Sequence, residues 1–325
     1  MISFAGICLG IALLIGGGTM LVRAASEIAE RFGISPMIVG LTIVAFGTSA
    51  PELVVNVFGA IRNETALAFG NVAGSNISNL GVVLALTAIV APIGIQGQLV
   101  RREVPLLLLG TTVLAVMALD GPLEGMPAVI GRTDSIVLML IFCIFIYISA
   151  LDFIRSQQTD KLLVDIAERS TLTKIKAGNL CWVILVLGCG LLFVGGEITV
   201  RNSTALAGLF GVSPAVIGLF IVGVGTSTPE LVTSIIAALR KESDLALGNV
   251  VGSNIFNTLF VLPITGMIRQ IPMPDGGIGD LVMSWGFAAL LIPVFVMRNG
   301  QLGRPAGVLF LIIYIVYAAY RVSMP

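Results

Sequence analysis

Two glutamates, Glu52 and Glu230, are the residues of this chain best suited to chemistry, because each lies within a long apolar stretch. If such a stretch crosses a membrane, an ionised side chain at its centre costs roughly 2.5–3.5 kcal/mol even on the most lenient scale, so it needs a partner or a function. No Lys or Arg lies near enough in these stretches to be an obvious counter-ion. The plain alternative is a pair of protonated glutamates that only hold helices together, and the residues around them argue against it.

Each glutamate ends the same short motif, Gly-Thr-Ser-x-Pro-Glu, at Gly47–Glu52 and at Gly225–Glu230. Pro51 and Pro229 have no N–H, so the carbonyl four residues earlier loses its helical partner, and the helix is expected to break around Gly-Thr-Ser. Free carbonyls at membrane depth are tolerated only where protein or ions satisfy them. The motif therefore predicts oxygen ligands from the backbone and from the side chains of Thr48, Ser49, Thr226 and Ser227.

A second motif, Gly-Asn-x-x-Gly-Ser-Asn-Ile-x-Asn, follows each glutamate at 70–79 and 248–257. Residues four apart share one face of a helix, so Ser75 lies with Asn79, and Ser253 with Asn257. We expect these two pairs to complete the site around the broken helices. For the other asparagines of the motif we expect hydrogen bonds between helices instead; they are Asn71, Asn76, Asn249 and Asn254.

All these candidate ligands are hard oxygens, and the chain contains no histidine. Such a set favours sodium, calcium, magnesium or manganese over zinc or copper. Two bidentate carboxylates and two threonine carbonyls offer six oxygens, within the number that calcium takes, whereas magnesium demands stricter octahedral geometry. Calcium is the better expectation from ligand chemistry alone.

The elements that must position these residues come in two copies. Three blocks recur 178 positions later, from Phe32 to Phe210, Gly47 to Gly225 and Gly70 to Gly248, so the chain is a duplication. With 57% hydrophobic and 11% charged residues and a mean hydropathy of +1.04, it is far more apolar than a soluble domain. We predict an all-α polytopic membrane protein with ten transmembrane helices. Their approximate ranges are 3–22, 36–60, 67–91, 103–119, 135–152, 178–200, 214–238, 245–268, 281–297 and 304–321. Ser35-Pro36 and Ser213-Pro214 predict an N-cap and first helical residue for the second helix of each half.

Because each half has an odd number of spans, the second half must enter the membrane from the opposite side, which gives two inverted five-helix repeats with broken core helices. We assign 1–152 to the first repeat, with its motif region at 47–79, and 178–325 to the second, with its motif region at 225–257. The segment 153–177 is expected to be a cytoplasmic linker. Both termini then lie outside, and of the 18 basic residues only Arg62, Arg132, Arg201, Arg269 and Arg321 fall on the outer side, as the positive-inside rule requires.

The paired motifs closely resemble the two α-repeats of the calcium/cation antiporter superfamily, and most of all its prokaryotic sodium/calcium exchangers. The resemblance implies an antiporter of the prokaryotic inner membrane, not an enzyme, that needs no cofactor and carries Ca²⁺ and Na⁺. It also implies that the ions and the lipid bilayer are its partners, that no nucleic acid is one, and that it works as a monomer. The positions that match the family's ion ligands are Thr48, Ser49, Glu52, Ser75, Asn79, Thr226, Ser227, Glu230, Ser253 and Asn257, with the backbone carbonyls of Ala45 and Gly223.

Some relatives, including potassium-dependent ones, carry an aspartate where this chain has Asn257, so potassium co-transport is not expected here. The expected mechanism is alternating access, in which spans 1 and 6 move across a core of the second, third, seventh and eighth spans. Two bare carboxylates repel each other, so the empty carrier should switch sides slowly until cations neutralise them. The nearest alternative is a proton/calcium antiporter of the same fold. A cation channel and an intramembrane hydrolase are further alternatives, and the absence of histidine disfavours the latter.

Overall fold

The computed structural model describes residues 2–62, 65–95, 97–123, 125, 128–167, 180–209, 223–297 and 300–323. Within these residues the chain is helical apart from turns and four two-residue strands, which confirms the predicted all-α class. Eight of the described helices are long and apolar enough to cross a membrane, or nine if a bent pair counts as one span. The count of ten spans stays a prediction, because the expected start of the seventh, together with Ser213-Pro214, lies outside the described residues.

The helices follow the order that the duplication predicts. In the first half they are α1 (Ile2–Phe32), α2 (Pro36–Val39), η1 (Gly40–Val44), α3 (Ala45–Thr48), α4 (Ala50–Ile61), α5 (Ala66–Ser78), η2 (Asn79–Leu84), α6 (Ala85–Val90), η3 (Leu99–Glu103), α7 (Val104–Leu123) and α8 (Arg132–Ala167). In the second half they are α9 (Leu180–Leu209), α11 (Gly223–Thr226), α12 (Thr228–Leu239), α13 (Ser243–Phe256), η5 (Asn257–Val261), α14 (Leu262–Ile268), α15 (Gly277–Met297) and α16 (Arg304–Ser323). Elements labelled η are π-helical turns.

Three helices run further than the sequence predicts. The first and sixth, α1 and α9, continue well past the expected ends at 22 and 200. The fifth, α8, passes the predicted boundary at 152 and reaches Ala167, so much of the predicted linker is helical, while 168–179 lies outside the described residues. The apolar part of α8 still ends at Asp152. Hydropathy marks where an apolar stretch ends, whereas good helix-forming residues continue the backbone hydrogen bonds beyond it.

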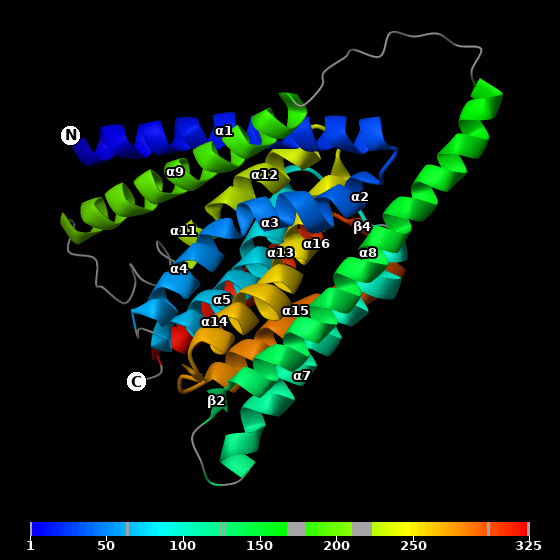
Figure 1. Ribbon diagram of the computed structural model, residues 1–325. Coiled ribbons are helices and arrows are strands. Elements are labelled where there is room, and N and C mark those ends of the chain that lie inside the picture. Colours follow the sequence, from blue (N-terminus) through cyan, green and yellow to red (C-terminus); the bar gives the residue numbers. More distant parts are fainter. Residues whose placement is uncertain are drawn as a thin grey trace.

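The helices α1 and α9 lie side by side and antiparallel along one face of the molecule (Figure 1). Glycines let their backbones touch. A Cβ built on Gly17 would lie 2.8 Å from the carbonyl oxygen of Gly188, and one on Gly10 would lie 2.9 Å from that of Gly195. Side chains this small are typical of tight helix pairs in membranes. The duplication carries Gly10 onto Gly188 and Gly17 onto Gly195, so the four residues form one two-fold-related contact, which we call the glycine seam.

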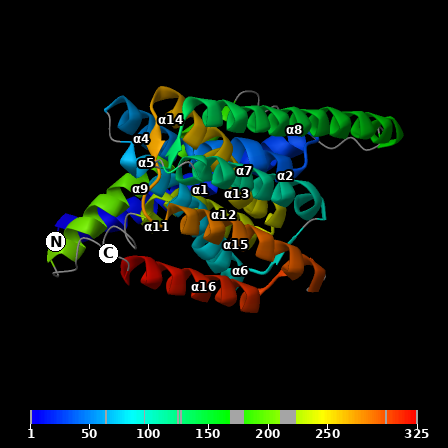
Figure 2. The same ribbon diagram turned by 90° about the horizontal axis from the view of Figure 1, so that it is seen from below.

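The remaining helices form the core and its other faces. The broken helices and α5, α13 and α14 fill the centre, and Figure 2 shows α8 and α16 along opposite faces of the molecule. Ion pairs tie helix ends together: Arg102 contacts Glu103 and Asp152, and Arg321 on α16 contacts Asp280 on α15 (Nε to Oδ1, 3.0 Å).

Two short strand pairs join loops of opposite halves. The first pairs β1 (Ile93–Gly94) with β4 (Gln301–Leu302), and the second pairs β2 (Val129–Ile130) with β3 (Ile271–Pro272), both antiparallel. Strands β1 and β3 are equivalent in the duplication, because Ile93 and Ile271 are 178 positions apart. Each of them follows the third span of its half and pairs with a strand from the loop between the last two spans of the other half. This arrangement agrees with a pseudo-two-fold relation between the halves.

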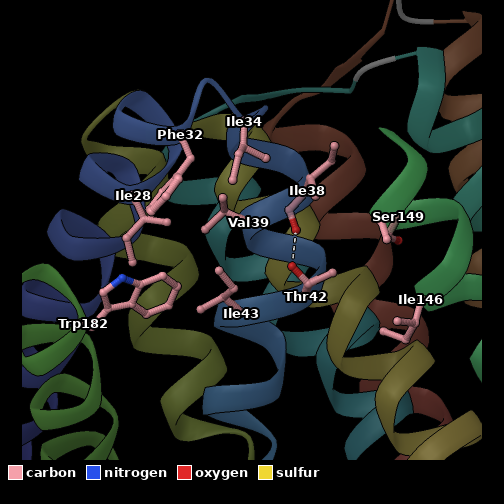
Figure 3. Close-up of a pocket in the computed structure, with 11 residues that line it drawn as sticks. Ile28, Phe32, Ile34, Ile38, Val39, Thr42, Ile43, Ile146, Ser149 and Trp182 are labelled. Carbon is pink, nitrogen blue, oxygen red and sulfur yellow. Dashed lines mark hydrogen bonds between the residues drawn. The ribbon is translucent and has the colours of Figure 1, made fainter. Parts of the chain in front are cut away.

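An apolar pocket of about 360 Å³ lies between α1, α9, α8 and the start of the second span (Figure 3). Its walls include Ile28, Ile38, Ile146 and Trp182, and the hydroxyl of Thr42 donates to the Ile38 carbonyl (2.6 Å). No carboxylate lines this pocket, so it has no ligand set for a cation and is separate from the site described next.

Candidate cation site

The predicted helix breaks are present in both halves. The helices on either side of Ser49 meet at 44°, and Ser49 itself leaves the helical region with φ −89° and ψ 3°. Its N–H still donates to the Ala45 carbonyl (2.9 Å), and its own carbonyl accepts from Leu53 (3.2 Å). Ser227 has nearly the same conformation, φ −85° and ψ 11°, between α11 and α12. Each proline therefore sits just inside a new helix, where its missing N–H costs little. The predicted N-cap of the first half is confirmed too, since the Ser35 side chain accepts from the N–H of Met37 (3.3 Å).

Glu52 and Glu230 lie in the first turns of α4 and α12, where the positive end of the helix dipole favours a carboxylate. They are 1% and 0% exposed. The Ser75 hydroxyl makes a long contact with Glu52 Oε1 and the Ser253 hydroxyl makes the same contact with Glu230 Oε1, both 3.5 Å. Ser49 reaches across the two halves and donates to Glu230 Oε1 (3.2 Å). The structure thus brings Ser75 to Glu52, and Ser49 and Ser253 to Glu230.

Each carboxylate has one oxygen left over. Oε2 of Glu52 and Oε2 of Glu230 are buried and have no hydrogen-bond partner among the described residues. None of the three ion pairs in the described part of the chain involves either glutamate. A buried carboxylate left without a partner is costly, and a bound cation is one way of removing that cost. The geometry therefore fits a cation held between the two halves.

A cavity of about 920 Å³ leads to Glu52 from one side. Its walls include Glu52 and Ser75 from the first half and Thr226 and Pro229 from the second. Glu197 on α9 also lines it and is exposed. The cavity is a route by which hydrated cations can approach Glu52, and apolar residues such as Val54, Phe58 and Phe193 line it as well.

The third span of each half changes geometry at a predicted ligand. The π-helical turns η2 and η5 begin at Asn79 and Asn257, a feature that often marks functional sites. Asn79 donates to Oδ1 of Asn254 (3.0 Å), and its own Oδ1 has no partner among the described residues. Both amide atoms of Asn257 are likewise buried and without a partner in the part of the chain that is described. Two buried amide oxygens are thus left for a ligand.

The asparagines predicted to join helices do so. Asn76 donates to Thr258 (2.8 Å), and Asn254 donates to the carbonyl of Asn76 (3.1 Å), which connects the third spans of the two halves. Asn71 donates to Asn56 (3.1 Å) and Asn249 to Ser234 (3.0 Å).

Sequence reasoning missed the acceptors of these bonds, Asn56, Ser234 and Thr258. Asn56 and Ser234 could have been found, because each follows its glutamate by four residues and they are one repeat apart.

The other predicted ligands are placed as follows. Thr48 is buried at the first break, Thr226 faces the cavity, and the Ser227 hydroxyl is buried without a partner among the described residues. The Ala45 carbonyl accepts from the N–H of Ser49 (2.9 Å) and lies within hydrogen-bond distance of the Thr48 hydroxyl (3.3 Å). Gly223 is the first residue of α11.

No group of three or more His, Cys, Asp or Glu side chains that could hold a metal occurs among the described residues. The site is therefore built from two charges and several neutral oxygens. The number of charged ligands sets how tightly calcium is held, so two carboxylates would hold it less tightly than a site with more carboxylates.

Comparisons with known proteins identify the family of the chain. The sequence profile described as "Sodium/calcium exchanger protein" matches residues 2–151 and 180–323. The chain belongs to this family. It is 33% identical over 330 residues to inner membrane protein YrbG of Escherichia coli (strain K12), covering 98% of this chain and 96% of that protein. It is 35% identical over 315 residues to putative antiporter CaxA of Alkalimonas amylolytica, covering 96% of each.

The fold matches a solved structure of the sodium-calcium exchanger NCX_Mj with a TM-score of 0.77, 28% identity and 98% of both chains covered. The membrane-protein class and the family inferred from the paired motifs are therefore confirmed, and the family is one of exchangers. The chain shares its membrane-helical architecture with NCX_Mj over almost its whole length.

Proposed function

We propose that this chain is a secondary antiporter that exchanges sodium for calcium by alternating access, with the ions bound between Glu52 and Glu230. The observation that carries the proposal is the buried glutamate pair at two helix breaks, in which each glutamate has one unpartnered oxygen among the described residues and Glu52 lines a cavity. A single calcium, or two or more sodium ions, would neutralise the pair. The empty carrier then keeps two close, poorly solvated negative charges, which disfavours switching without cargo.

The ligand set we propose is the one that the family resemblance implies. Its side chains come from both breaks and both third spans, and the Ala45 and Gly223 carbonyls add two oxygens for sodium. The members are Ala45, Thr48, Ser49, Glu52, Ser75, Asn79, Gly223, Thr226, Ser227, Glu230, Ser253 and Asn257. Many of them are neutral hydroxyl or carbonyl oxygens, which favours sodium as the driving ion, because a proton needs no such cage.

We further propose ten spans in two inverted repeats, in the inner membrane of a prokaryote, with both termini outside and the 153–177 segment in the cytoplasm. The family, the inner-membrane relative and the basic residues of the loops support this placement. Arg62 and Pro274, which line the cavity beside Glu52, lie in predicted outer loops, so the cavity would open outward. One chain contains both halves of the site, and we expect it to function as a monomer.

The decisive experiment is sodium-gradient-driven calcium uptake by the purified full chain in proteoliposomes. We expect uptake by the wild type and its loss in Glu52→Gln and in Glu230→Gln, since each substitution removes a charge that the cargo must neutralise. Glu197→Gln is the matched control, because Glu197 lines the same cavity but is exposed. Exchange retained in both glutamate variants would overturn the site. Calcium movement driven by a proton gradient without sodium would instead favour the proton/calcium antiporter.

A further inference from the structure

The first helix break is joined to the second half by two side-chain hydrogen bonds. The nearest acceptor for the Thr48 hydroxyl is Oδ1 of Asn249 (3.0 Å), with the Val44 carbonyl of its own helix at 3.1 Å, and Ser49 donates to Glu230 (3.2 Å). Asn249 is oriented for this contact, because its amide nitrogen donates to Ser234 (3.0 Å) and so leaves its oxygen facing Thr48. All five side chains are buried. The first break is therefore docked tightly on the second half.

The second break makes different contacts, although it shares the Gly-Thr-Ser and Pro-Glu residues of the first. Asn71, the repeat counterpart of Asn249, keeps its anchoring bond to Asn56 (3.1 Å), but it lines the open cavity together with Thr226. The Ser227 hydroxyl, the counterpart of the Ser49 hydroxyl that donates to Glu230, is buried without a partner among the described residues, so Glu52 has only the contact from Ser75. The Thr-Ser and Pro-Glu residues shared by the two breaks thus make different contacts in the conformation described.

The helices around the breaks show the same difference. Val55 on α4 lines the cavity and is 56% exposed, whereas Thr233, its counterpart on α12, is 0% exposed. Helix α1 covers α12, because a Cβ built on Gly18 of α1 would lie 2.9 Å from Cδ1 of Ile236 on α12. Gly196, the counterpart of Gly18 on α9, lines the cavity instead. Exchanging the roles of the halves would cover α4 and uncover α12.

We propose that Asn249 and Asn71 are positioning residues that hold the two opposite conformations of the carrier in turn. The Asn249–Thr48 hydrogen bond stabilises the conformation described here, in which the cavity opens beside α4. An Asn71–Thr226 hydrogen bond stabilises the conformation in which an equivalent cavity opens beside α12. The inference rests on the proposed function, since only a carrier with alternating access has two such states. Neither asparagine needs to touch the ion, because each acts through the threonine at the opposite break.

Two cysteine reporters test the proposal. In a chain freed of Cys8, Cys143, Cys181 and Cys189, either Val55→Cys or Thr233→Cys is introduced and its rate of reaction with a polar maleimide is measured. The protein is held in nanodiscs, where the reagent reaches both faces, in buffer free of sodium and calcium. The Thr233 hydroxyl has no hydrogen-bond partner among the described residues, so this reporter breaks no known contact. In the starting chain we expect fast reaction at position 55 and slow reaction at position 233.

The two asparagine variants should move the buried reporter in opposite directions. Asn249→Ala should raise the rate at position 233 by about two- to tenfold, the factor set by one buried hydrogen bond, without raising the rate at position 55. Asn71→Ala should lower the rate at position 233 by a similar factor. Thr48→Val, which keeps the side-chain shape, should act as Asn249→Ala does. Thr87→Val is the matched control, because that buried hydroxyl bonds only within its own helix (2.6 Å to the Val83 carbonyl).

The outcomes separate this inference from the proposed function. Rates that rise together at both positions would show general loosening and overturn it, as would an unchanged rate at position 233 in both Asn249→Ala and Thr48→Val. A rise at that position in Asn71→Ala would also contradict it. The labelling requires no transport. If the wild type exchanges sodium for calcium but the reporters do not respond, only the inference fails. If the reporters respond as expected and no exchange is found, the positioning roles stand and the proposed cargo is wrong.

Discussion

The glycine seam between α1 and α9 makes a sharp prediction about two neighbouring residues. In Gly17→Ala the new Cβ would meet the Gly188 carbonyl oxygen and the Leu192 nitrogen, both at 2.8 Å. Carbon and oxygen approach to about 3.3 Å at closest, so the helices must part by about half an ångström. Overpacking of this kind costs about 1–3 kcal/mol. The adjacent Gly16 faces open space, and a Cβ added there would meet nothing within 4 Å, so Gly16→Ala should be neutral or stabilise the helix by up to about 1 kcal/mol.

Denaturant unfolding in detergent measures this difference. Gly188→Ala adds a second test, because its Cβ would meet the same crossing, 3.0 Å from the Gly17 carbonyl oxygen. Once the helices have parted for one methyl group, the second should cost little, so the double variant should lose clearly less stability than the two single variants together. Equal stability of Gly16→Ala and Gly17→Ala, or full additivity of the seam variants, would refute the reasoning. If α1 and α9 move as one body, the rate of sodium/calcium exchange should fall in Gly17→Ala and should be retained in Gly16→Ala.

Three other outcomes are expected. Calcium uptake should fall as the pH on both sides is lowered from about 8 to about 5, because protons compete with cations for Glu52 and Glu230; constant uptake over this range would contradict the site. Arg321→Gln removes a partly exposed ion pair with Asp280, so the free energy of unfolding should drop by only about 0.5–1 kcal/mol. Asn76→Ala removes a buried interhelical hydrogen bond and should cost more, about 1–3 kcal/mol; the reverse order of these two losses would contradict the assigned roles.

Local chemistry made the breaks predictable. Pro51 and Pro229 lack an N–H wherever the chain goes, so the interruption could be placed to within a residue or two from sequence alone. The helical spacing of Ser75 and Asn79 likewise fixed a shared face. The π-helical turns at Asn79 and Asn257 were not predicted, because an extra residue in a turn depends on packing against neighbouring helices. The length of α8 was missed because its last turns are polar.

A different limit applies to the contacts between halves. Asn71 and Asn249 stand in the same motif, and no local rule distinguishes them. In the conformation described, Asn249 meets the opposite break while Asn71 lines the cavity. Sequence reasoning could therefore name candidate residues for the site, but it could not say which of them are in contact.

The glycine seam also constrains how the two copies of the duplicated chain can diverge. Thr258 and Leu80 occupy equivalent positions in the two copies, but only Thr258 is polar. Asn76 therefore has a hydroxyl acceptor in the other half, and leucine offers Asn254 none. At the seam each glycine meets the backbone of the other copy, so a side chain gained in one half has to be accommodated by both. Mutations can thus change the polar residues at the centre of one half without a matching change in the other half. At the glycine seam, a substitution in one half requires a compensating change in the other.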